Sequence, residues 1–305
     1  MLIQESHADV QTAANGKESR MRIFVFHPSI AGYPNARFPG VALFSEIYQV
    51  TGPVARFARQ IAGQGYIVAA PSSYHDFTGP EPLAYDAPGT DQGNRWKAEK
   101  TLESYDEDAR RTVDHLLALP TCTGRVGATG MCLGGHLALR AGVRCAILGC
   151  YANSILELRC LSWPKYVHTR TLGPNAGPNA APTAPSPTSP HTLDRLSLLA
   201  GGPGRPGPGC EACLIFGACD PHVPDAGRDL IRQKLRAAAG AVFAWHEFAW
   251  AQHAFVRDEL SKGRYDPAVT RACFELLLEL FGRVLRTELG AGEGAAPVRD
   301  GDLVC

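Results

Sequence analysis

The stretch GATGMCLGGHLALRAG, from Gly127 to Gly142, joins a run of small residues to an apolar helical pattern through a glycine-rich turn. Gly130 and Gly134 stand two positions before and two positions after Cys132, in the pattern G-M-C-L-G. This pattern is typical of a nucleophile elbow, a sharp turn that connects a strand to a helix and presents a reactive side chain. Because the pattern is short, a glycine-rich turn that carries an inert buried cysteine is the alternative interpretation.

The position of Cys132 at the start of a helix would give its thiol a specific chemistry. The positive end of the helix dipole favours the thiolate, which is the nucleophilic form of cysteine. The same geometry directs the backbone N–H of Leu133 at the place where an oxyanion would form. We therefore predict that Cys132 is a nucleophile and that Leu133 is an oxyanion-hole donor.

Strand patterns alternate with helix patterns on both sides of this turn. Short apolar runs bounded by glycine and proline predict strands at residues 21–28, 40–46, 66–71, 125–130, 144–152, 213–220 and 241–249. Amphipathic periods predict helices within residues 51–65, 102–120, 133–142, 227–238 and 266–285. This alternation predicts an α/β fold, with a mainly parallel sheet and helices on both of its faces.

The remaining segments have compositions that do not support a packed core. We expect residues 1–20 to be a flexible N-terminal segment that precedes a single domain at 21–290. An insertion interrupts that domain at about 153–211, and its part 173–209 contains nine prolines, which predicts disorder. The tail at 291–305 is also predicted to be disordered.

Composition limits the partners that we expect. Thirty basic residues balance thirty acidic ones, which argues against nucleic acid or an anionic membrane as partner. The polar N-terminus has no apolar signal-peptide core, so we expect a cytoplasmic protein whose ten cysteines are reduced. The single CEAC pair lacks a second pair, and no nucleotide or calcium loop occurs, so we expect no metal and no cofactor. The expected state is a monomer or a homodimer.

Asp220 and His253 follow Cys132 in the order that a hydrolase of this fold requires. Asp220 ends the predicted strand CLIFGACD, and His253 comes shortly after the predicted strand AVFAWHEFA. In α/β hydrolases the nucleophile, the acid and the histidine come in this order, and the carboxyl ends of parallel strands share one edge. Such an aspartate can be a helix cap and such a histidine can be structural, but the combination predicts a Cys–His–Asp triad.

At these positions the sequence resembles the dienelactone hydrolases (carboxymethylenebutenolidases), which have the α/β-hydrolase fold. GMCLGGHLAL is similar to the nucleophile turn of that family, FGACDPHVP to its acid segment, and HAFVR to its histidine and following arginine. Residues 41–74 are similar to an early segment with a glutamate after a strand. The resemblance covers most of residues 21–286, apart from the stretch around 152–212.

The resemblance implies a role for each matching residue. Cys132 would be the nucleophile, His253 its base and Asp220 the carboxylate that orients the histidine. Glu46 would contact the thiol and help to deprotonate it when substrate arrives. Ile47 would donate the second N–H of the oxyanion hole.

The resemblance also implies how substrate is held. Arg257 would bind a carboxylate of the substrate, and Arg95 is a candidate for a second such arginine. Ala254 stands where the family commonly has a serine, which bears on substrate identity more than on reaction type. An alternative interpretation of Arg257 is a surface arginine that pairs with Asp258 or Glu259.

Together these residues predict a hydrolase that opens a small lactone or cleaves a small ester, carrying a carboxylate, through an acyl-thioester on Cys132. A carboxylate beside a thiol disfavours the thiolate, so Glu46 fits only as a proton acceptor that moves into place. The alternatives are a general carboxylesterase or thioesterase, and a non-catalytic binding protein that keeps the fold. His136 is predicted to pack within its helix, and Tyr85 is one of several aromatic residues that could line a pocket or the core.

Overall fold

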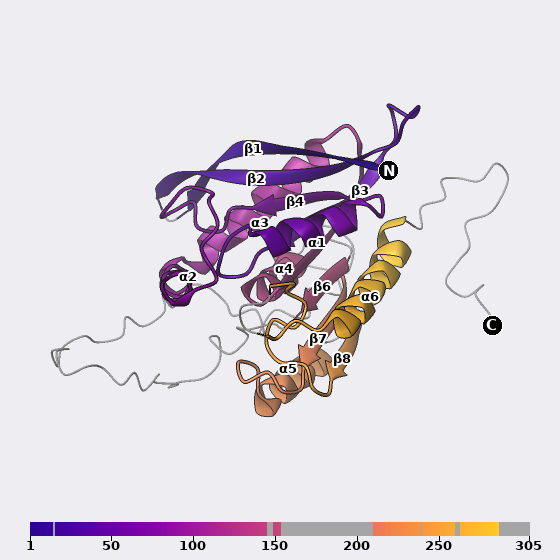
Figure 1. Ribbon diagram of the computed structural model, residues 1–305. Helices are drawn as coiled ribbons and strands as arrows, with labels where there is room; N and C mark the ends of the chain where they lie inside the picture. Colours follow the sequence, from indigo (N-terminus) through magenta and orange to yellow (C-terminus); the bar gives the residue numbers. More distant parts are fainter. Residues whose placement is uncertain (15, 145–148, 154–209, 239, 260–262, 287–305) are drawn as a thin grey trace, which may run out of the picture.

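The computed structural model describes residues 1–14, 16–144, 149–153, 210–238, 240–259 and 263–286 (Figure 1). Over these ranges the strands form one sheet in the order β1-β2-β4-β3-β5-β6-β7-β8. The strands are β1 (Leu2–Ala14), β2 (Lys17–Ser29), β3 (Phe38–Phe44), β4 (Ile67–Pro71), β5 (Cys122–Met131), β6 (Gly149–Asn153), β7 (Glu211–Gly217) and β8 (Phe243–Phe248). The helices are α1 (Gly52–Ala62), α2 (Ala87–Glu99), α3 (Leu102–Ala118), α4 (Leu133–Arg144), α5 (Asp225–Ala237) and α6 (Pro267–Arg286).

The sheet is parallel over most of its width. Neighbouring strands run parallel from β4 through β3, β5, β6 and β7 to β8, whereas β2 pairs antiparallel with both β4 and β1. The predicted mainly parallel sheet is therefore confirmed. Because parallel strands end at one edge, the carboxyl ends of β3, β5, β7 and β8 lie along the edge where open α/β sheets form their ligand sites.

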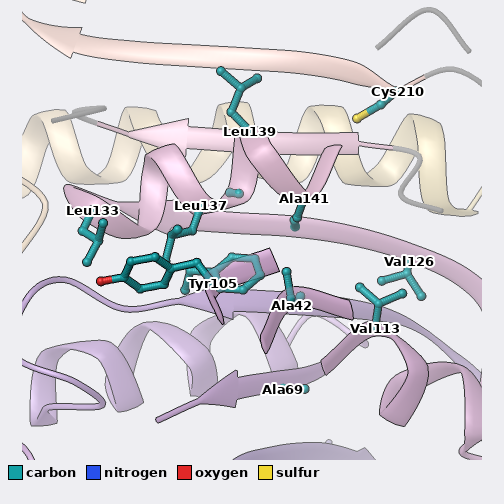
Figure 2. Close-up of a cluster of buried hydrophobic side chains, with 14 of the residues drawn as sticks. Ala42, Ala69, Tyr105, Val113, Val126, Leu133, Leu137, Leu139, Ala141 and Cys210 are labelled. Carbon is teal, nitrogen blue, oxygen red and sulfur yellow. The ribbon is translucent and has the colours of Figure 1, made fainter. Parts of the chain in front are cut away.

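Helices cover both faces of the sheet, as predicted. On one face, Tyr105 and Val113 of α3 and Leu137 of α4 belong to a buried apolar cluster with strand residues (Figure 2). On the other face, Ile61 of α1 and Phe281 of α6 belong to a second cluster. All residues of β3 and β4 are buried, as expected for strands that are covered on both sides.

Residues 1–20 differ from the expected flexible segment. Leu2–Ala14 pairs with Lys17–Ser29 along its whole length and forms the edge of the sheet. Seven of the thirteen side chains of β1 are exposed, and its polar and apolar residues do not alternate, so the sequence lacks the pattern by which a strand is recognised. Backbone hydrogen bonds hold this strand, together with an ion pair of 2.8 Å between Asp9 and Arg22. A polar edge strand of this kind also resists pairing with other chains.

Helix α2 lies in a stretch for which the sequence predicts only a polar connection. Its N-cap residue Asp86 accepts a hydrogen bond of 2.8 Å from the N–H of Gly89, as a helix N-terminus requires. The helix has few apolar residues, so no amphipathic period marks it. Tertiary contacts hold it instead: the Tyr74 hydroxyl donates to the carbonyl of Gly93 at 3.0 Å, and the Trp96 ring stacks on Phe77.

Several expectations concern residues outside the described ranges. The disorder predicted for 173–209 and 291–305 lies there, as does nearly all of the predicted insertion at 153–211. None of the cysteines whose side chains are described belongs to a disulfide; these are Cys122, Cys132, Cys210, Cys213, Cys219 and Cys273. Within the described part of the chain, no helix is long and apolar enough to cross a membrane, and no group of three or more His, Cys, Asp or Glu side chains is arranged to hold a metal ion.

A buried network of charges ties the loop after β4 to α2 and α3. Lys100, at the end of α2, has no exposed side-chain surface; it pairs with Asp76, and its Nζ lies 3.0 Å from Oδ2 of Asp108. Nε2 of His75 lies 2.7 Å from the other carboxylate oxygen of Asp108. Burial would raise the pKa of Asp76, but the Lys100 ammonium outweighs this effect and lowers it. The network therefore fixes the end of α2 to the body of the domain.

Replacing Lys100 by methionine should lower the free energy of unfolding by about 3 kcal/mol, because Asp76 and Asp108 would stay largely buried without their cation. Urea unfolding followed by circular dichroism measures this change. Arg271 is a suitable control, since it is exposed and pairs with Glu275 one helical turn away. Arg271→Met should cost less than about 0.5 kcal/mol, and equal losses in the two variants would contradict the prediction.

Candidate functional site

The turn at Cys132 has the geometry of a nucleophile elbow. Cys132 follows the last residue of β5 and precedes α4, and its φ of 60° lies in the left-handed region that non-glycine residues rarely adopt. A Cβ atom on Gly134 would collide with the carbonyl oxygen of Phe44, and one on Gly130 would collide with the backbone of Gly134. Only glycine therefore fits at these two positions, because the elbow lies directly against the end of β3.

His253 and Asp220 lie in the turns that follow β8 and β7. A hydrogen bond of 3.0 Å from the N–H of Cys219 to the carbonyl of Ala251 joins these two turns. Nδ1 of His253 lies 2.8 Å from Oδ2 of Asp220, and the sulfur of Cys132 is close enough to the imidazole to raise its pKa. The structure thus brings together the three residues that the sequence places far apart.

The electrostatics of this group favour a charged imidazole. Burial would lower the pKa of His253, but the sulfur of Cys132 and the carboxylate of Asp220 outweigh burial and raise that pKa to about 10. Burial would likewise raise the pKa of Asp220, but its hydrogen bond with His253 lowers it. The backbone N–H of His222 donates to the second oxygen of Asp220 at 2.8 Å, so both oxygens are held in place.

Glu46 is 1% exposed and lies two residues after β3. The Tyr85 hydroxyl donates to Oε2 of Glu46 at 3.0 Å, and Nη1 of Arg257 lies 3.4 Å from Oε1. Burial raises the pKa of Glu46, although Arg257 and Tyr85 both favour the ionised form. Both carboxylate oxygens therefore have partners other than the Cys132 thiol. The resemblance implies a contact between Glu46 and that thiol, and this contact is not among the described contacts of Glu46.

Arg257 is 6% exposed, so it is not the surface arginine of the alternative interpretation. Its guanidinium carbon lies 4.4 Å from the ring centroid of Tyr85 and 5.7 Å from that of Tyr48. The neighbouring Asp258 pairs with Arg56, whose Nε lies 2.5 Å from Oδ2. Two aromatic rings thus hold the cation of Arg257 inside the site, where cation–π attraction adds to its ion pair.

Leu133 and Ile47, the expected oxyanion-hole donors, are both buried. Leu133 is the first residue of α4, and the first N–H groups of a helix have no acceptor within the helix. Ile47 lies between β3 and α1, and a Cβ atom on Gly93 of α2 would collide with its carbonyl oxygen. Close packing of α2 therefore fixes the peptide between Ile47 and Tyr48, which neighbours the peptide that carries the Ile47 N–H.

Two further residues lie apart from the group around Glu46. Arg95 is on α2 and is exposed, and it does not occur among the described contacts of Glu46, Arg257 and Tyr85. His136 is buried in α4, where burial lowers its pKa to about 3, so its ring is neutral at physiological pH. His136 is therefore a buried residue of α4 that packs inside the protein.

Tyr85 is the residue of this site that sequence reasoning did not single out. It donates to Glu46, its hydroxyl lies 2.6 Å from Oγ1 of Thr51, and its ring contacts Arg257. Its sequence surroundings are a polar connection rich in glycine and proline, which offers no periodic signal. Only the three-dimensional path of that connection reveals the contact.

Replacing Glu46 by glutamine should favour the folded state increasingly as pH rises. The pKa of Glu46 is raised in the folded protein, so its contribution to stability is complete below about pH 4.5 and is lost as pH rises through the folded-state pKa. Glutamine does not titrate, and the ion pair of Glu46 with Arg257, which forms only when Glu46 is ionised, is already included in the net upward shift of the Glu46 pKa. Urea unfolding between about pH 5 and pH 8 measures the difference, and a difference that falls with rising pH would contradict the prediction.

Comparison with known proteins places these residues in one family. The sequence pattern of the dienelactone hydrolase family matches residues 26–152, a range that includes Glu46 and Cys132. The Saccharomyces cerevisiae protein named "Putative carboxymethylenebutenolidase" is 48% identical to this chain over 295 residues. That alignment covers 95% of this chain and 95% of the yeast protein.

Solved structures agree in fold. The "Putative Dienelactone Hydrolase" of Klebsiella pneumoniae subsp. pneumoniae MGH 78578 has a TM-score of 0.63 at 19% identity, over 92% of this chain and 99% of that one. A dienelactone hydrolase-like promiscuous phosphotriesterase from metagenomic libraries has a TM-score of 0.62 at 17% identity, over 92% and 98%. The fold is that of the α/β hydrolases, and this chain belongs to the dienelactone hydrolase family.

Proposed function

We propose that this chain hydrolyses a small lactone or ester that carries a carboxylate, with Cys132 as nucleophile, His253 as base and Asp220 as the group that orients the imidazole. The observation that carries this proposal is the position of the His253 ring, whose Nδ1 lies 2.8 Å from the Asp220 carboxylate and whose pKa is raised by the nearby sulfur of Cys132. A base between a nucleophile and an orienting acid is the arrangement that acyl transfer requires.

In the acylation step, the thiolate of Cys132 attacks the carbonyl carbon and forms a tetrahedral oxyanion. The N–H groups of Leu133 and Ile47 would stabilise this oxyanion, each by about 3 kcal/mol in the transition state. Collapse of the intermediate breaks the ester C–O bond, and the imidazolium of His253 gives its proton to the leaving oxygen. A lactone ring opens in this step, and the acyl group remains on the sulfur as a thioester.

In the deacylation step, the now neutral His253 takes a proton from water, and the resulting hydroxide attacks the thioester carbon. A second tetrahedral oxyanion collapses with cleavage of the C–S bond. The acid product leaves, and the Cys132 thiolate returns to the thiol when Glu46 gives back its proton and pairs with Arg257 again. The raised pKa of His253 supports this sequence, since the ring can hold the proton that it gives to the leaving oxygen.

The contacts of Glu46 support the preference for an acidic substrate. Arg257 is paired with Glu46 inside the site. A substrate carboxylate that binds Arg257 would compete with Glu46 for the guanidinium. The released carboxylate of Glu46, whose pKa burial has already raised, would then accept the thiol proton. Binding of an acidic substrate would in this way activate Cys132.

Replacing Cys132 by alanine should reduce the hydrolysis of lactones and esters by at least about 1,000-fold, because no other group forms the thioester. Cys219→Ser, which changes an exposed thiol, is the matched control and should keep activity. Peptide mass spectrometry after incubation with a lactone should locate an acyl adduct on Cys132. Full activity of the alanine variant would refute the nucleophile, and a folded wild type inactive on every substrate would favour a non-catalytic binding protein.

Replacing Arg257 by glutamine should lower kcat/KM for a carboxylate-bearing lactone about tenfold more than for a neutral aryl ester, since only the first substrate loses a charged partner. The comparison of two substrates separates this effect from any disturbance of Glu46, which would affect both. Arg56→Gln, an exposed arginine that pairs with Asp258, should leave the ratio unchanged. An unchanged ratio in the Arg257 variant would indicate a general carboxylesterase or thioesterase.

A further inference from the structure

Gln49 is a buried polar residue in a left-handed conformation, on the segment that follows β3. Its surface is completely buried, and its φ is 63°, a value that residues with a Cβ atom rarely adopt. It comes three positions after Glu46 and two after Ile47, and the proposed hydrolysis gives it no role. Glycine would adopt this conformation without strain, so the side chain at this position needs a reason of its own.

The amide group of Gln49 makes three hydrogen bonds to the connection between β4 and α2. Nε2 donates to the carbonyl oxygen of Gly79 at 3.0 Å and to that of Glu81 at 2.8 Å. Oε1 accepts from the backbone N–H of Tyr74 at 3.1 Å. Two carbonyl groups and one N–H need a partner with two donors and an acceptor, which the amide provides and which neither glutamate nor methionine could replace. The strained backbone is therefore combined with a side chain that fits its three partners.

The segment that Gln49 contacts is an exposed loop, so apolar burial contributes little to its position. Thr78 and Glu81, for example, are exposed. Such a loop keeps its course mainly through hydrogen bonds. A further bond, of 3.0 Å from the N–H of Leu83 to the carbonyl of Tyr48, joins the same two segments. Gln49 thus ties the loop to the segment after β3 from inside the protein.

This loop ends at Tyr85, four positions after Glu81. The Tyr85 hydroxyl donates to Glu46, and its ring lies against Arg257. Because Gln49 and Glu46 belong to one short segment, the tie fixes the course of the loop relative to Glu46. We propose that Gln49 is a positioning residue that holds Tyr85 against Glu46 and Arg257. Its effect on substrate preference, described next, rests on the proposed function.

Displacement of Tyr85 would affect an acidic substrate more than a neutral one. The guanidinium carbon of Arg257 lies 4.4 Å from the centroid of the Tyr85 ring, which orients the cation for a substrate carboxylate. The Tyr85 hydroxyl also holds the carboxylate of Glu46, which that substrate would separate from Arg257. A neutral ester has no carboxylate to bind Arg257. Gln49 should therefore contribute to the preference for acidic substrates.

Gln49→Met keeps the length of the side chain and removes its three hydrogen bonds. It should lower kcat/KM for a carboxylate-bearing lactone about fivefold more than for a neutral aryl ester. Gln49→Gly, which relieves the left-handed strain, should change this ratio in the same direction and serves where the methionine variant does not fold. Thr112→Val removes a buried hydrogen bond of 2.7 Å within α3 and should leave the ratio unchanged. An unchanged ratio in both Gln49 variants would overturn the proposal.

A double-mutant cycle tests whether Gln49 acts through Tyr85. In a Tyr85→Leu background, Gln49→Met should change the ratio of the two kcat/KM values by less than about twofold, because the residue that Gln49 positions is already absent. A general loss of stability would lower activity in both backgrounds alike. The full effect of Gln49→Met in the Tyr85→Leu background would therefore overturn the assignment.

Hydrogen exchange followed by mass spectrometry tests the tie without any substrate. The peptide that covers residues 79–85 should exchange at least about tenfold faster in Gln49→Met than in the wild type, and Thr112→Val should not have this effect. This result does not depend on hydrolysis. An inactive wild type would refute the proposed function, whereas unchanged exchange in Gln49→Met would refute the role of Gln49.

Discussion

The contact between the turn at Cys132 and the carbonyl of Phe44 is the constraint on which the rest of the site depends. It leaves no room for a side chain at Gly130 or Gly134, and between these glycines Cys132 has a left-handed conformation. Such a conformation costs on the order of 1 kcal/mol or more, which the packing of β5 and α4 must offset. In return, the thiol lies at the start of a helix and close to the segment that carries Glu46.

Two buried polar groups meet at this edge of the sheet, and their charges are coupled. The first is the His253 imidazole with Cys132 and Asp220; the second is Glu46 with Arg257 and Tyr85. A positive charge on His253 favours the ionised form of Glu46, whereas burial opposes it. A carboxylate whose pKa is raised is better matched to proton transfer near neutral pH than an exposed one. Burial of Glu46 thus serves the chemistry that we propose for it.

The elbow could be predicted from sequence because its requirements are local. Two glycines at fixed positions on either side of Cys132 indicate the turn. The alternation of strand and helix patterns indicates the parallel sheet. Asp220 and His253 could be predicted because each follows a recognisable strand. Their positions follow from topology, since the carboxyl ends of parallel strands share one edge.

The remaining features depend on contacts that leave no local pattern. The strand at Leu2–Ala14 is polar and exposed, so its pairing with β2 rather than its side chains stabilises it. Helix α2 depends on contacts of Gly93 and Trp96 with other segments. Tyr85 reaches Glu46 across 39 positions of sequence, through a connection whose course only the folded chain defines. Helix and strand propensities and hydrophobic periodicity describe neighbouring residues only, so they do not predict these long-range contacts.

All parallel strands of the sheet run in one direction, so different backbone groups are presented at its two edges. N–H groups at one edge attract negative charge, and carbonyl oxygens at the other attract positive charge. At the carboxyl edge, the N-terminus of α4 presents the N–H of Leu133, and such N–H groups stabilise negative charge. At the amino edge, the end of α6 and the start of β5 present carbonyl oxygens to Arg125 and Arg37. Those carbonyls orient the two arginines by hydrogen bonds. The backbone of the amino edge therefore suits side-chain cations, whereas the backbone of the carboxyl edge suits a negative charge such as a developing oxyanion.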